Sequence, residues 1–179
     1  MIKIAFAGPQ QAGKTTAALQ ILEKFRNKAP VNIKFADPIY EVLNIFESTK
    51  NRYFMQDFGS LARYHFGDTI FDKIFVDSIN LATNANVKVI TCDDIRREHE
   101  LYTAKNLGFF TIYIDAETDI RKRRAQKQNL QFREKHISET EVPALAEYCD
   151  KIIDNSGTIE QFSYNIFLAT ERIFAESAV

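Results

Sequence analysis

The chain has 179 residues, the length of one ordinary domain, and its 45% hydrophobic and 26% charged residues exclude disordered and fibrous classes. The formal net charge is −1, so the composition does not favour nucleic acid as a partner. No apolar run approaches the roughly 20 residues of a membrane span, which argues against a membrane partner.

Two cysteines, Cys92 and Cys149, are too few for a disulfide framework and indicate a reducing compartment. The strand pattern begins at Ile2, which leaves no room for a signal peptide. The sequence contains no repeat, no low-complexity segment and no linker rich in proline, glycine or serine. We therefore expect a cytoplasmic protein whose residues 1–179 form a single domain.

An apolar run at Ile2–Ala7 predicts a buried strand, and Thr15–Arg26 predicts the helix that follows. Residues 8–15 between them read Gly-Pro-Gln-Gln-Ala-Gly-Lys-Thr and fit the phosphate-loop pattern G-x-x-x-x-G-K-[ST] at every fixed position. Such glycines let successive backbone N–H groups point at one anion, and the helix adds the positive end of its dipole. Because a strand and a helix flank the loop, a chance match is the weaker alternative, and we expect nucleoside triphosphate binding.

The positions of this loop have distinct expected tasks. Lys14 can reach the outer phosphates, and the hydroxyl of Thr15 can ligate Mg²⁺. The residues expected to bind the triphosphate are Gln11, Ala12, Gly13, Lys14, Thr15 and Thr16. The loop by itself does not predict how the nucleotide is used.

Val31–Ala36 predicts a second strand, which Asp37-Pro38 would stop. Three helical patterns follow, at Ile39–Phe46, Tyr53–Phe66 and Thr69–Thr83. This part of the chain is therefore expected to be a helical region without strands.

The third strand, predicted at Val87–Thr91, is followed by Asp93 and Asp94 and then by a helix at Ile95–Asn106. An acid that follows an apolar strand beside a phosphate loop commonly joins the coordination of Mg²⁺. Adjacent side chains on a strand point in opposite directions, so one of the two acids is expected to face the metal, and we assign Asp94 to it. Capping of the next helix is the alternative role for either acid.

Arg96 and Glu100 lie four residues apart on that helix, which places them on one face. Two interpretations are open. They form an exposed ion pair that contributes little, or Arg96 neutralises a substrate phosphate while Glu100 orients it.

Phe109–Ile114 predicts the fourth strand, and Asp119–Gln128 predicts a very basic helix after it. Arg121 and Arg124 share one face of that helix. Arginines at this edge of a sheet can clamp a phosphoryl group during transfer. A solvated basic helix and a nucleic-acid patch are the alternatives.

The chain continues with a short helix at Val142–Tyr148, a fifth strand at Lys151–Asp154 and a final helix at Ile159–Glu176. On the final helix, Phe167 and Phe174 fit either the core or a homodimer contact. Continuous apolar strands that alternate with helices predict a parallel sheet covered on both faces. The expected fold class is therefore α/β, a three-layer sandwich around about five parallel strands, with ligands beyond their carboxyl ends.

The order and spacing of several short segments resemble the phage-type deoxynucleoside monophosphate kinases, a family of P-loop nucleotide kinases. The segments are Phe35-Ala36-Asp37-Pro38, Met55-Gln56-Asp57-Phe58-Gly59 with Arg63, Gly67-Asp68 with Phe71, Val89 to Glu100, His136-Ile137-Ser138-Glu139 and Ile153 to Thr158. Phe71 stands at a tryptophan-like position, which leaves base specificity open. Arg97-Glu98-His99 replaces a more apolar stretch, which leaves the contacts near Arg96 open.

The resemblance implies that ATP, with Mg²⁺ as cofactor, phosphorylates a deoxynucleoside 5′-monophosphate to the diphosphate. It implies a substrate-binding helical region at about residues 37–84, a lid at about residues 117–140 and, for a phage-encoded member, the host cytoplasm. The residues implied for the acceptor are Asp37, Gln56, Arg63, Asp94, Arg96 and Glu100. Those implied for catalysis are Lys14, Arg96, Arg121 and Arg124, while Arg121, Asn155, Gly157 and Thr158 join the loop in binding ATP.

Other functions fit the same loop. They are another small-molecule kinase, such as a dephospho-coenzyme A or phosphomevalonate kinase, a kinase of modified bases in DNA, and an ATP-binding module without transfer. The sequence offers more cationic groups than one nucleotide needs, which favours two phosphorylated ligands; they are Arg63, Arg96, Arg121 and Arg124.

Overall fold

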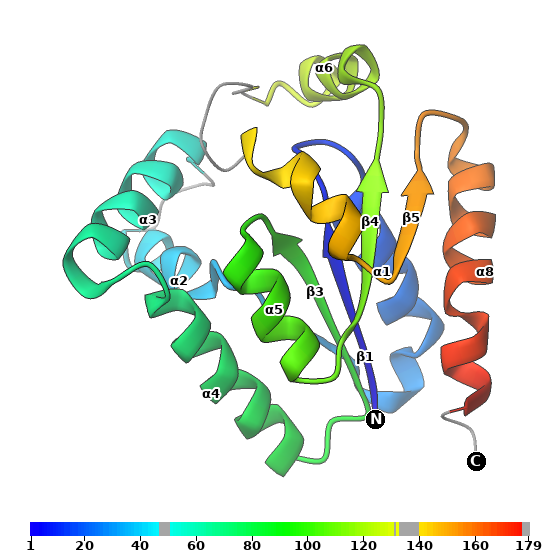
Figure 1. Ribbon diagram of the computed structural model, residues 1–179, viewed down its shortest axis with the longest axis horizontal. Coiled ribbons are helices and arrows are strands. Elements are labelled where there is room, and N and C mark those ends of the chain that lie inside the picture. The colour runs from blue at the N-terminus through cyan, green and yellow to red at the C-terminus, as the bar shows by residue number, and fades with distance from the viewer. Residues whose placement is uncertain (47–50, 131, 133–139, 177–179) are drawn as a thin grey trace.

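The computed structural model describes residues 1–46, 51–130, 132 and 140–176 of the chain. Five parallel strands form one sheet in the order β2-β3-β1-β4-β5 (Figure 1). The strands are β1 (Ile2–Ala7), β2 (Val31–Asn32), β3 (Val89–Ile95), β4 (Phe110–Asp115) and β5 (Lys151–Asp154). The predicted α/β class and the parallel sheet are confirmed.

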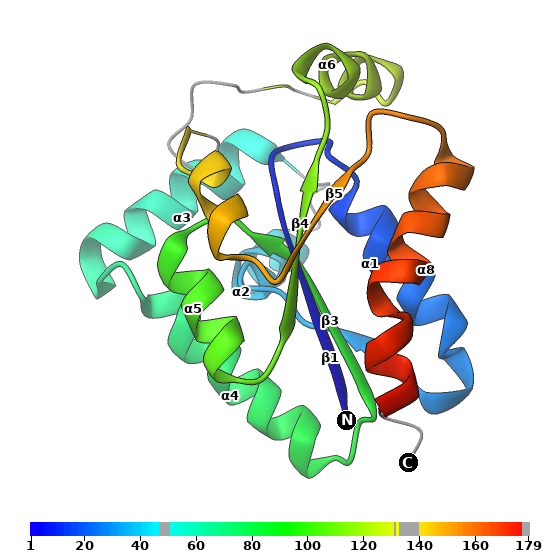
Figure 2. The same ribbon diagram turned by 45° about the vertical axis from the view of Figure 1, so that its right-hand side comes forward.

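Helices cover both faces of this sheet (Figures 1 and 2). One face carries α1 (Lys14–Lys24) and α8 (Ile159–Glu176), with the 3-10 helix η1 (Arg26–Lys28) after α1. The other face carries α2 (Asp37–Ile45), α4 (Ile70–Asn84), α5 (Glu98–Asn106) and the 3-10 helix η2 (Val142–Tyr148). Helix α3 (Arg52–Phe66) packs against α2 and α4, and α6 (Thr118–Lys127) follows the carboxyl end of β4. Within the described ranges, no helix has the length and apolar character needed to cross a membrane.

Alternate residues of β1 supply two hydrophobic cores, one on each face of the sheet. Ile4 and Phe6 pack toward α1 and α8, whereas Ala5 and Ala7 lie in the core of the opposite face. Small side chains there leave room for large aromatic ones such as Phe75, which is 1% exposed. Burying one such side chain stabilises the fold by roughly 1.5–3 kcal/mol. The first strand is buried, as predicted, and the helices on both faces of the sheet pack against it.

Of Phe167 and Phe174 on the final helix, only Phe174 joins the core. Phe174 packs edge to face against Phe25 of the α1 side, with ring centroids 4.8 Å apart. Phe167 is 44% exposed, and Lys24 Nζ lies 4.6 Å from the centre of its ring. The homodimer that Phe167 could serve stays a prediction.

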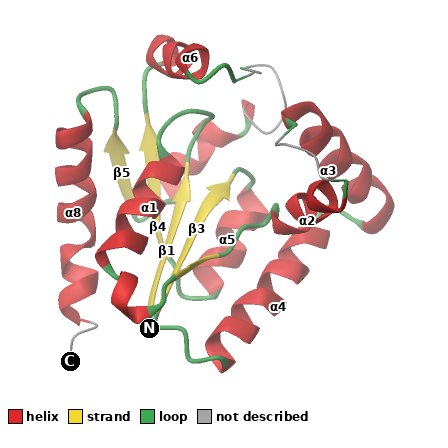
Figure 3. Cartoon of the chain, turned by 180° about the vertical axis from the view of Figure 1, so that it is seen from behind, coloured by secondary structure: helices red, strands yellow, loops and turns green. Residues whose placement is uncertain are grey.

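At two places the elements differ from the sequence predictions by three or more residues, and carboxylate contacts explain the first. The second strand ends at Asn32, before the predicted end at Ala36, because the following N–H groups bind carboxylates of Asp37 and Asp94 and turn the chain out of the sheet. Helix α5 begins at Glu98, after the predicted start at Ile95, because β3 continues through Ile95. Both changes lie at the carboxyl edge of the sheet, which Figure 3 shows from behind with α6 above it and α2 and α3 beside it.

Candidate active site

The phosphate loop, residues 8–15, joins β1 to α1, and its backbone requires glycine at two positions. Gly8 has φ +138° and Gly13 has φ +114°, values that L side chains rarely adopt. A Cβ on Gly8 would strike the carbonyl oxygen of Ile114, and a Cβ on Gly13 would strike the side-chain nitrogen of Asn155. Asn155 Nδ2 also donates a hydrogen bond to the carbonyl of Ala12 at 2.7 Å. Asn155 therefore holds the loop from the β5 side.

Lys14 begins α1 and lies almost fully buried, with 6% exposure. Its Nζ donates hydrogen bonds to the carbonyl oxygens of Gly8 and Pro9, the latter at 2.8 Å. The ammonium therefore lies over the loop, next to the backbone that would bind phosphates.

Asp93, near the end of β3, is the acid that faces this loop. Its Oδ2 accepts a hydrogen bond from Thr15 Oγ1 at 2.6 Å, and its Oδ1 accepts one from Asn32 Nδ2 at 2.8 Å. Lys34 Nζ lies 3.0 Å from Oδ1. Burial on its own raises the pKa of the Asp93 carboxyl, but these hydrogen bonds and the charge of Lys34 outweigh it and hold that pKa below its ordinary value. Asp93 is therefore an ionised carboxylate beside a hydroxyl.

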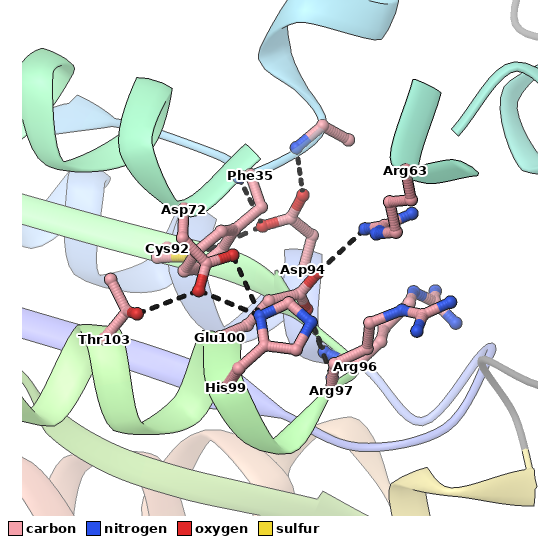
Figure 4. A network of polar contacts seen from close by, with 11 residues as sticks. Phe35, Arg63, Asp72, Cys92, Asp94, Arg96, Arg97, His99, Glu100 and Thr103 are labelled. Carbon is pink, nitrogen blue, oxygen red and sulfur yellow. Dashed lines mark hydrogen bonds and ion pairs between the residues drawn. The ribbon is translucent and has the colours of Figure 1, made fainter. Parts of the chain in front are cut away.

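Asp94 points away from Thr15, which corrects our assignment of Asp94 to the metal. Its carboxylate accepts hydrogen bonds from the N–H groups of Phe35 at 3.1 Å and Ala36 at 2.9 Å (Figure 4). Burial raises the pKa of Asp94, and the neighbouring charge of Asp93 raises it further. Side chains alternate along a strand, so two consecutive acids cannot both face the loop. The strand register decides which of them does, and the sequence pattern does not reveal that register.

A cavity of about 440 Å³ extends from the phosphate loop toward α2 and α3. It brings together many of the predicted site residues: Gln11, Gly13, Lys14, Thr15, Thr16, Gln56, Arg63, Asp94, Arg96 and Glu100. It also contains residues to which the sequence analysis gave no role, among them Lys34, Tyr40 and Arg97. Part of the predicted donor set and most of the predicted acceptor set therefore line one cavity.

Asp37 is a predicted acceptor residue that the structure does not bring to this cavity. Its Oδ2 accepts a hydrogen bond from the N–H of Lys34 at 2.7 Å, at the start of α2. Burial raises the pKa of the Asp37 carboxyl. Asp37 is not among the lining residues, and its observed contact shapes the turn before the helix.

Arg63 and Glu100 form an ion pair between α3 and α5 in the cavity wall (Figure 4). Arg63 Nη2 lies 3.1 Å from Glu100 Oε1, and the two side chains are 16% and 4% exposed. Glu100 Oε2 accepts hydrogen bonds from the N–H of Arg96 at 2.9 Å and of Arg97 at 3.2 Å. Burial raises the pKa of Glu100. The structure therefore excludes an exposed ion pair and shows Glu100 organising the arginines.

Two residues of α4 support this cluster from behind. The Phe71 ring centre lies 4.7 Å from the guanidinium of Arg63. Asp72 is buried; its Oδ2 lies 2.8 Å from His99 Nδ1 and accepts a hydrogen bond from Thr103 Oγ1 at 2.9 Å (Figure 4). The hydrogen bond to Asp72 raises the pKa of His99. Sequence reasoning missed Asp72, because its partners lie on a helix that follows a later strand.

Arg121 and Arg124 reach the phosphate loop from α6. Arg121 Nη1 donates a hydrogen bond to the carbonyl of Gln10, and Arg124 Nη1 donates one to the carbonyl of Gln11, each at 3.3 Å. Arg124 Nη2 also donates to the carbonyl of Asn155 at 2.7 Å. The described residues that line the cavity do not include either arginine. Their role in clamping a phosphoryl group stays a prediction.

The remaining predicted ATP residues lie before α8. Thr158 Oγ1 accepts a hydrogen bond from the N–H of Gln161 at 3.3 Å, and Gly157 precedes it in the turn. Neither is a lining residue of the cavity, so their contact with adenine stays a prediction. Of the predicted lid, residue 131 and residues 133–139, which include the segment from His136 to Glu139, lie outside the described residues.

Residues 28–166 match the family model of the deoxynucleotide monophosphate kinases. The chain belongs to this family. The match begins after the phosphate loop, so the loop and the family model are separate observations. As a member of the deoxynucleotide monophosphate kinase family, the protein is a phosphotransferase of the nucleotide or small-molecule kinase class.

Solved structures of other kinases share this fold. A sugar kinase from Janibacter sp. has a TM-score of 0.61 at 12% identity, over 94% of this chain and 93% of that chain. APS kinase CysC of Mycobacterium tuberculosis, in complex with AMPPNP and APS, has a TM-score of 0.55 at 12% identity, over 95% and 97%. Shikimate kinase from Bacteroides thetaiotaomicron has a TM-score of 0.54 at 14% identity, over 96% and 98%. A search of curated proteins finds no match to the sequence.

The oxygen ligands at the loop of this family member fit Mg²⁺. The ion prefers oxygen ligands and commonly combines one or two carboxylates with substrate phosphates. Thr15 supplies a hydroxyl and Asp93 an ionised carboxylate, 2.6 Å from each other. Across the described part of the chain, no group of three or more His, Cys, Asp or Glu residues could hold a metal.

Proposed function

We propose that the protein transfers the γ-phosphate of ATP to the 5′-phosphate of a deoxynucleoside monophosphate. The observation that carries this proposal is the shared cavity, lined by Lys14 and Thr15 of the loop and also by Arg63 and Arg96. Two sets of anion-binding groups around one cavity favour two phosphorylated ligands that face each other.

The donor triphosphate would bind the phosphate loop, where backbone N–H groups and Lys14 receive its outer phosphates. Lys14 Nζ now donates to the carbonyls of Gly8 and Pro9, and a phosphate oxygen can replace these acceptors. Thr15 and Asp93 would hold Mg²⁺, which when bound neutralises charge on the outer phosphates.

The acceptor phosphate would bind Arg63 and Arg96, with Gln56 beside them. The ion pair with Glu100 fixes the guanidinium of Arg63 before a substrate arrives, so less ordering is required on binding. An apolar wall lies next to these groups and could receive the base and sugar; it contains Phe35, Ile39, Tyr40, Met55 and Phe71. The acceptor site would therefore combine cationic side chains for the phosphate with an apolar wall for the base and sugar.

The reaction itself would require little from the protein besides positioning and charge. An oxygen of the acceptor phosphate forms the new bond to the γ-phosphorus, while the bond from that phosphorus to the β,γ-bridging oxygen breaks and its electron pair leaves with ADP. A phosphate monoester has a second pKa of about 6, so its oxygen is ionised at neutral pH and no general base is needed. Lys14, Arg63 and Arg96 would offset the negative charge that accumulates.

A ligand screen tests the acceptor. The melting temperature is measured with each deoxynucleoside and ribonucleoside monophosphate, with dephospho-coenzyme A and with phosphomevalonate, because a true ligand stabilises the folded state by mass action. Each compound is then incubated with ATP and Mg²⁺, and ADP release is followed. We expect stabilisation and turnover with deoxynucleoside monophosphates, and loss of turnover with retained folding in the variant Lys14→Ala. Phosphorylation of another compound in the panel, or ATP binding without transfer, would contradict the proposal.

A further inference from the structure

Lys34 lines the cavity and belongs to neither the donor set nor the acceptor set described above. Its Nζ is 3.0 Å from Oδ1 of Asp93, and the two side chains are 23% and 1% exposed. Lys34 lines the cavity together with Thr15 and Tyr40, and its Nζ lies 5.6 Å from the centre of the Tyr40 ring. The ammonium is therefore within reach of both the phosphate loop and the apolar wall.

The backbone around Lys34 is fixed on both sides. The N–H of Lys34 donates to Asp37 Oδ2 at 2.7 Å, and the next two N–H groups donate to the carboxylate of Asp94. A lysine ammonium, by contrast, ends a flexible four-carbon stem. The Nζ can therefore exchange one anion for another without any change in the backbone.

Lys34 and the proposed metal site use the same carboxylate. Asp93 accepts the hydrogen bond from Thr15 on Oδ2 and holds Lys34 at 3.0 Å from Oδ1. An ammonium and a divalent cation at one carboxylate repel each other, so close contact with both is unfavourable. Lys34 thus pairs with the carboxylate of Asp93 until a metal takes its place there, and the Lys34 ammonium then needs another anion.

We propose that Lys34 is a catalytic residue, which leaves Asp93 when Mg²⁺ and ATP bind and then contacts the phosphoryl group during transfer. This proposal rests on the proposed function. The anions nearest to the released ammonium would be the γ-phosphate at Lys14 and the acceptor phosphate at Arg63, since all three side chains line one cavity. Lys34 forms no covalent bond and gives up no proton; it supplies mobile positive charge between two phosphates.

The competing explanation is that Lys34 is a fixed counter-ion of a buried acid. In that case its loss lowers stability and leaves the chemical step alone. The two explanations differ in kcat and in metal affinity, so both quantities are measured. The chain offers a matched control in Lys105, whose Nζ lies 2.8 Å from Asp150 Oδ1; neither residue is among those that line the cavity.

The test compares the variants Lys34→Met, Lys34→Arg and Lys105→Met with the wild-type protein. Steady-state kcat is measured with ATP, Mg²⁺ and the acceptor found in the screen. Binding of Mn²⁺ to the complex with ADP is measured by electron paramagnetic resonance, which requires no turnover. Melting temperatures show that each variant is folded, and Lys34→Arg keeps the charge should Lys34→Met fail to fold.

We expect kcat of Lys34→Met to fall about 100-fold, while Mn²⁺ binds at least as tightly as in the wild-type protein. Lys34→Arg is expected to retain more activity than Lys34→Met, and Lys105→Met to match the wild type in both measurements. A fall in kcat of less than tenfold, or weaker Mn²⁺ binding in Lys34→Met, would overturn the proposal. A wild-type protein that phosphorylates a different acceptor would instead refute the deoxynucleotide assignment, and the kcat ratio would still test Lys34.

Discussion

Thr15 Oγ1 and Asp93 Oδ2 lie 2.6 Å apart, although 78 residues separate them in the chain. The contact links the start of α1 to the end of β3, two elements that a parallel sheet brings to the same edge. It also distinguishes two adjacent acids, because Asp94 faces the opposite side and binds backbone N–H groups. We therefore expect substitutions of Asp93 and of Asp94 to affect catalysis differently.

Asp93→Asn is expected to lower kcat by about 100-fold or more and to weaken Mn²⁺ binding to the ADP complex, because an amide lacks the charge that a divalent ion requires. Asp94→Asn is the matched control. It should keep the Mn²⁺ affinity but lower the melting temperature, since an amide offers only one oxygen to the N–H groups of Phe35 and Ala36. The opposite pattern in electron paramagnetic resonance titrations would restore the assignment of the metal to Asp94.

Local patterns predicted much of the fold. The phosphate loop is fixed by a motif within residues 8–15, and apolar runs were sufficient to place the strands and helices of the parallel sheet. The end of the second strand could not be predicted in the same way. The N–H groups of Phe35 and Ala36 bind Asp94, which lies 59 and 58 residues further along the chain. A local sequence pattern cannot predict a contact between residues so far apart in the chain.

The candidate site shows the same division. Arg63, Arg96 and Glu100 were predicted from the family resemblance and line one cavity. The helical spacing that placed Arg96 and Glu100 on one face was wrong, because α5 begins at Glu98 and Arg96 precedes it. Lys34 and Asp72 were missed. Each acts through a partner on a distant element, Asp93 in one case and His99 in the other, and such pairing is known only once the sheet and helices are assembled.

Glu100→Gln is expected to destabilise the protein by on the order of 3–5 kcal/mol, because the change leaves the buried charge of Arg63 without its partner. Urea unfolding measures this loss. The KM for the acceptor should rise as well, since Arg63 and the start of α5 lose their common support. Glu23→Gln is the control: its ion pair with Arg26 is exposed and should contribute at most about 1 kcal/mol. Equal losses in both variants would show that Glu100 does not support the cluster.

Protonation of His99 is expected to make the free energy of unfolding depend on pH. The hydrogen bond to Asp72 raises the pKa of His99 above its ordinary value of 6.5, so the folded protein binds this proton more tightly than the unfolded chain does. The stabilisation is fully present below about pH 6.5 and is lost as the pH rises through the folded-state pKa. The difference in urea midpoint between the wild-type protein and His99→Gln should therefore narrow from pH 5.5 to 8.5. His65→Gln removes an exposed histidine as a control, and a difference that widens with pH would contradict the prediction.

Arg124 provides the test of the predicted clamp on α6. Its guanidinium joins the carbonyl of Gln11 in the phosphate loop to the carbonyl of Asn155 after β5, so Arg124→Met should weaken ADP binding about tenfold, or about 1.4 kcal/mol. If the same arginine also contacts the phosphoryl group in transfer, kcat at saturating ATP falls on the order of 100-fold in addition, and we expect both effects. Arg123→Met removes the same charge from the exposed side of α6 and should change neither quantity. Weaker ADP binding with kcat within tenfold of the wild type would limit Arg124 to holding the loop.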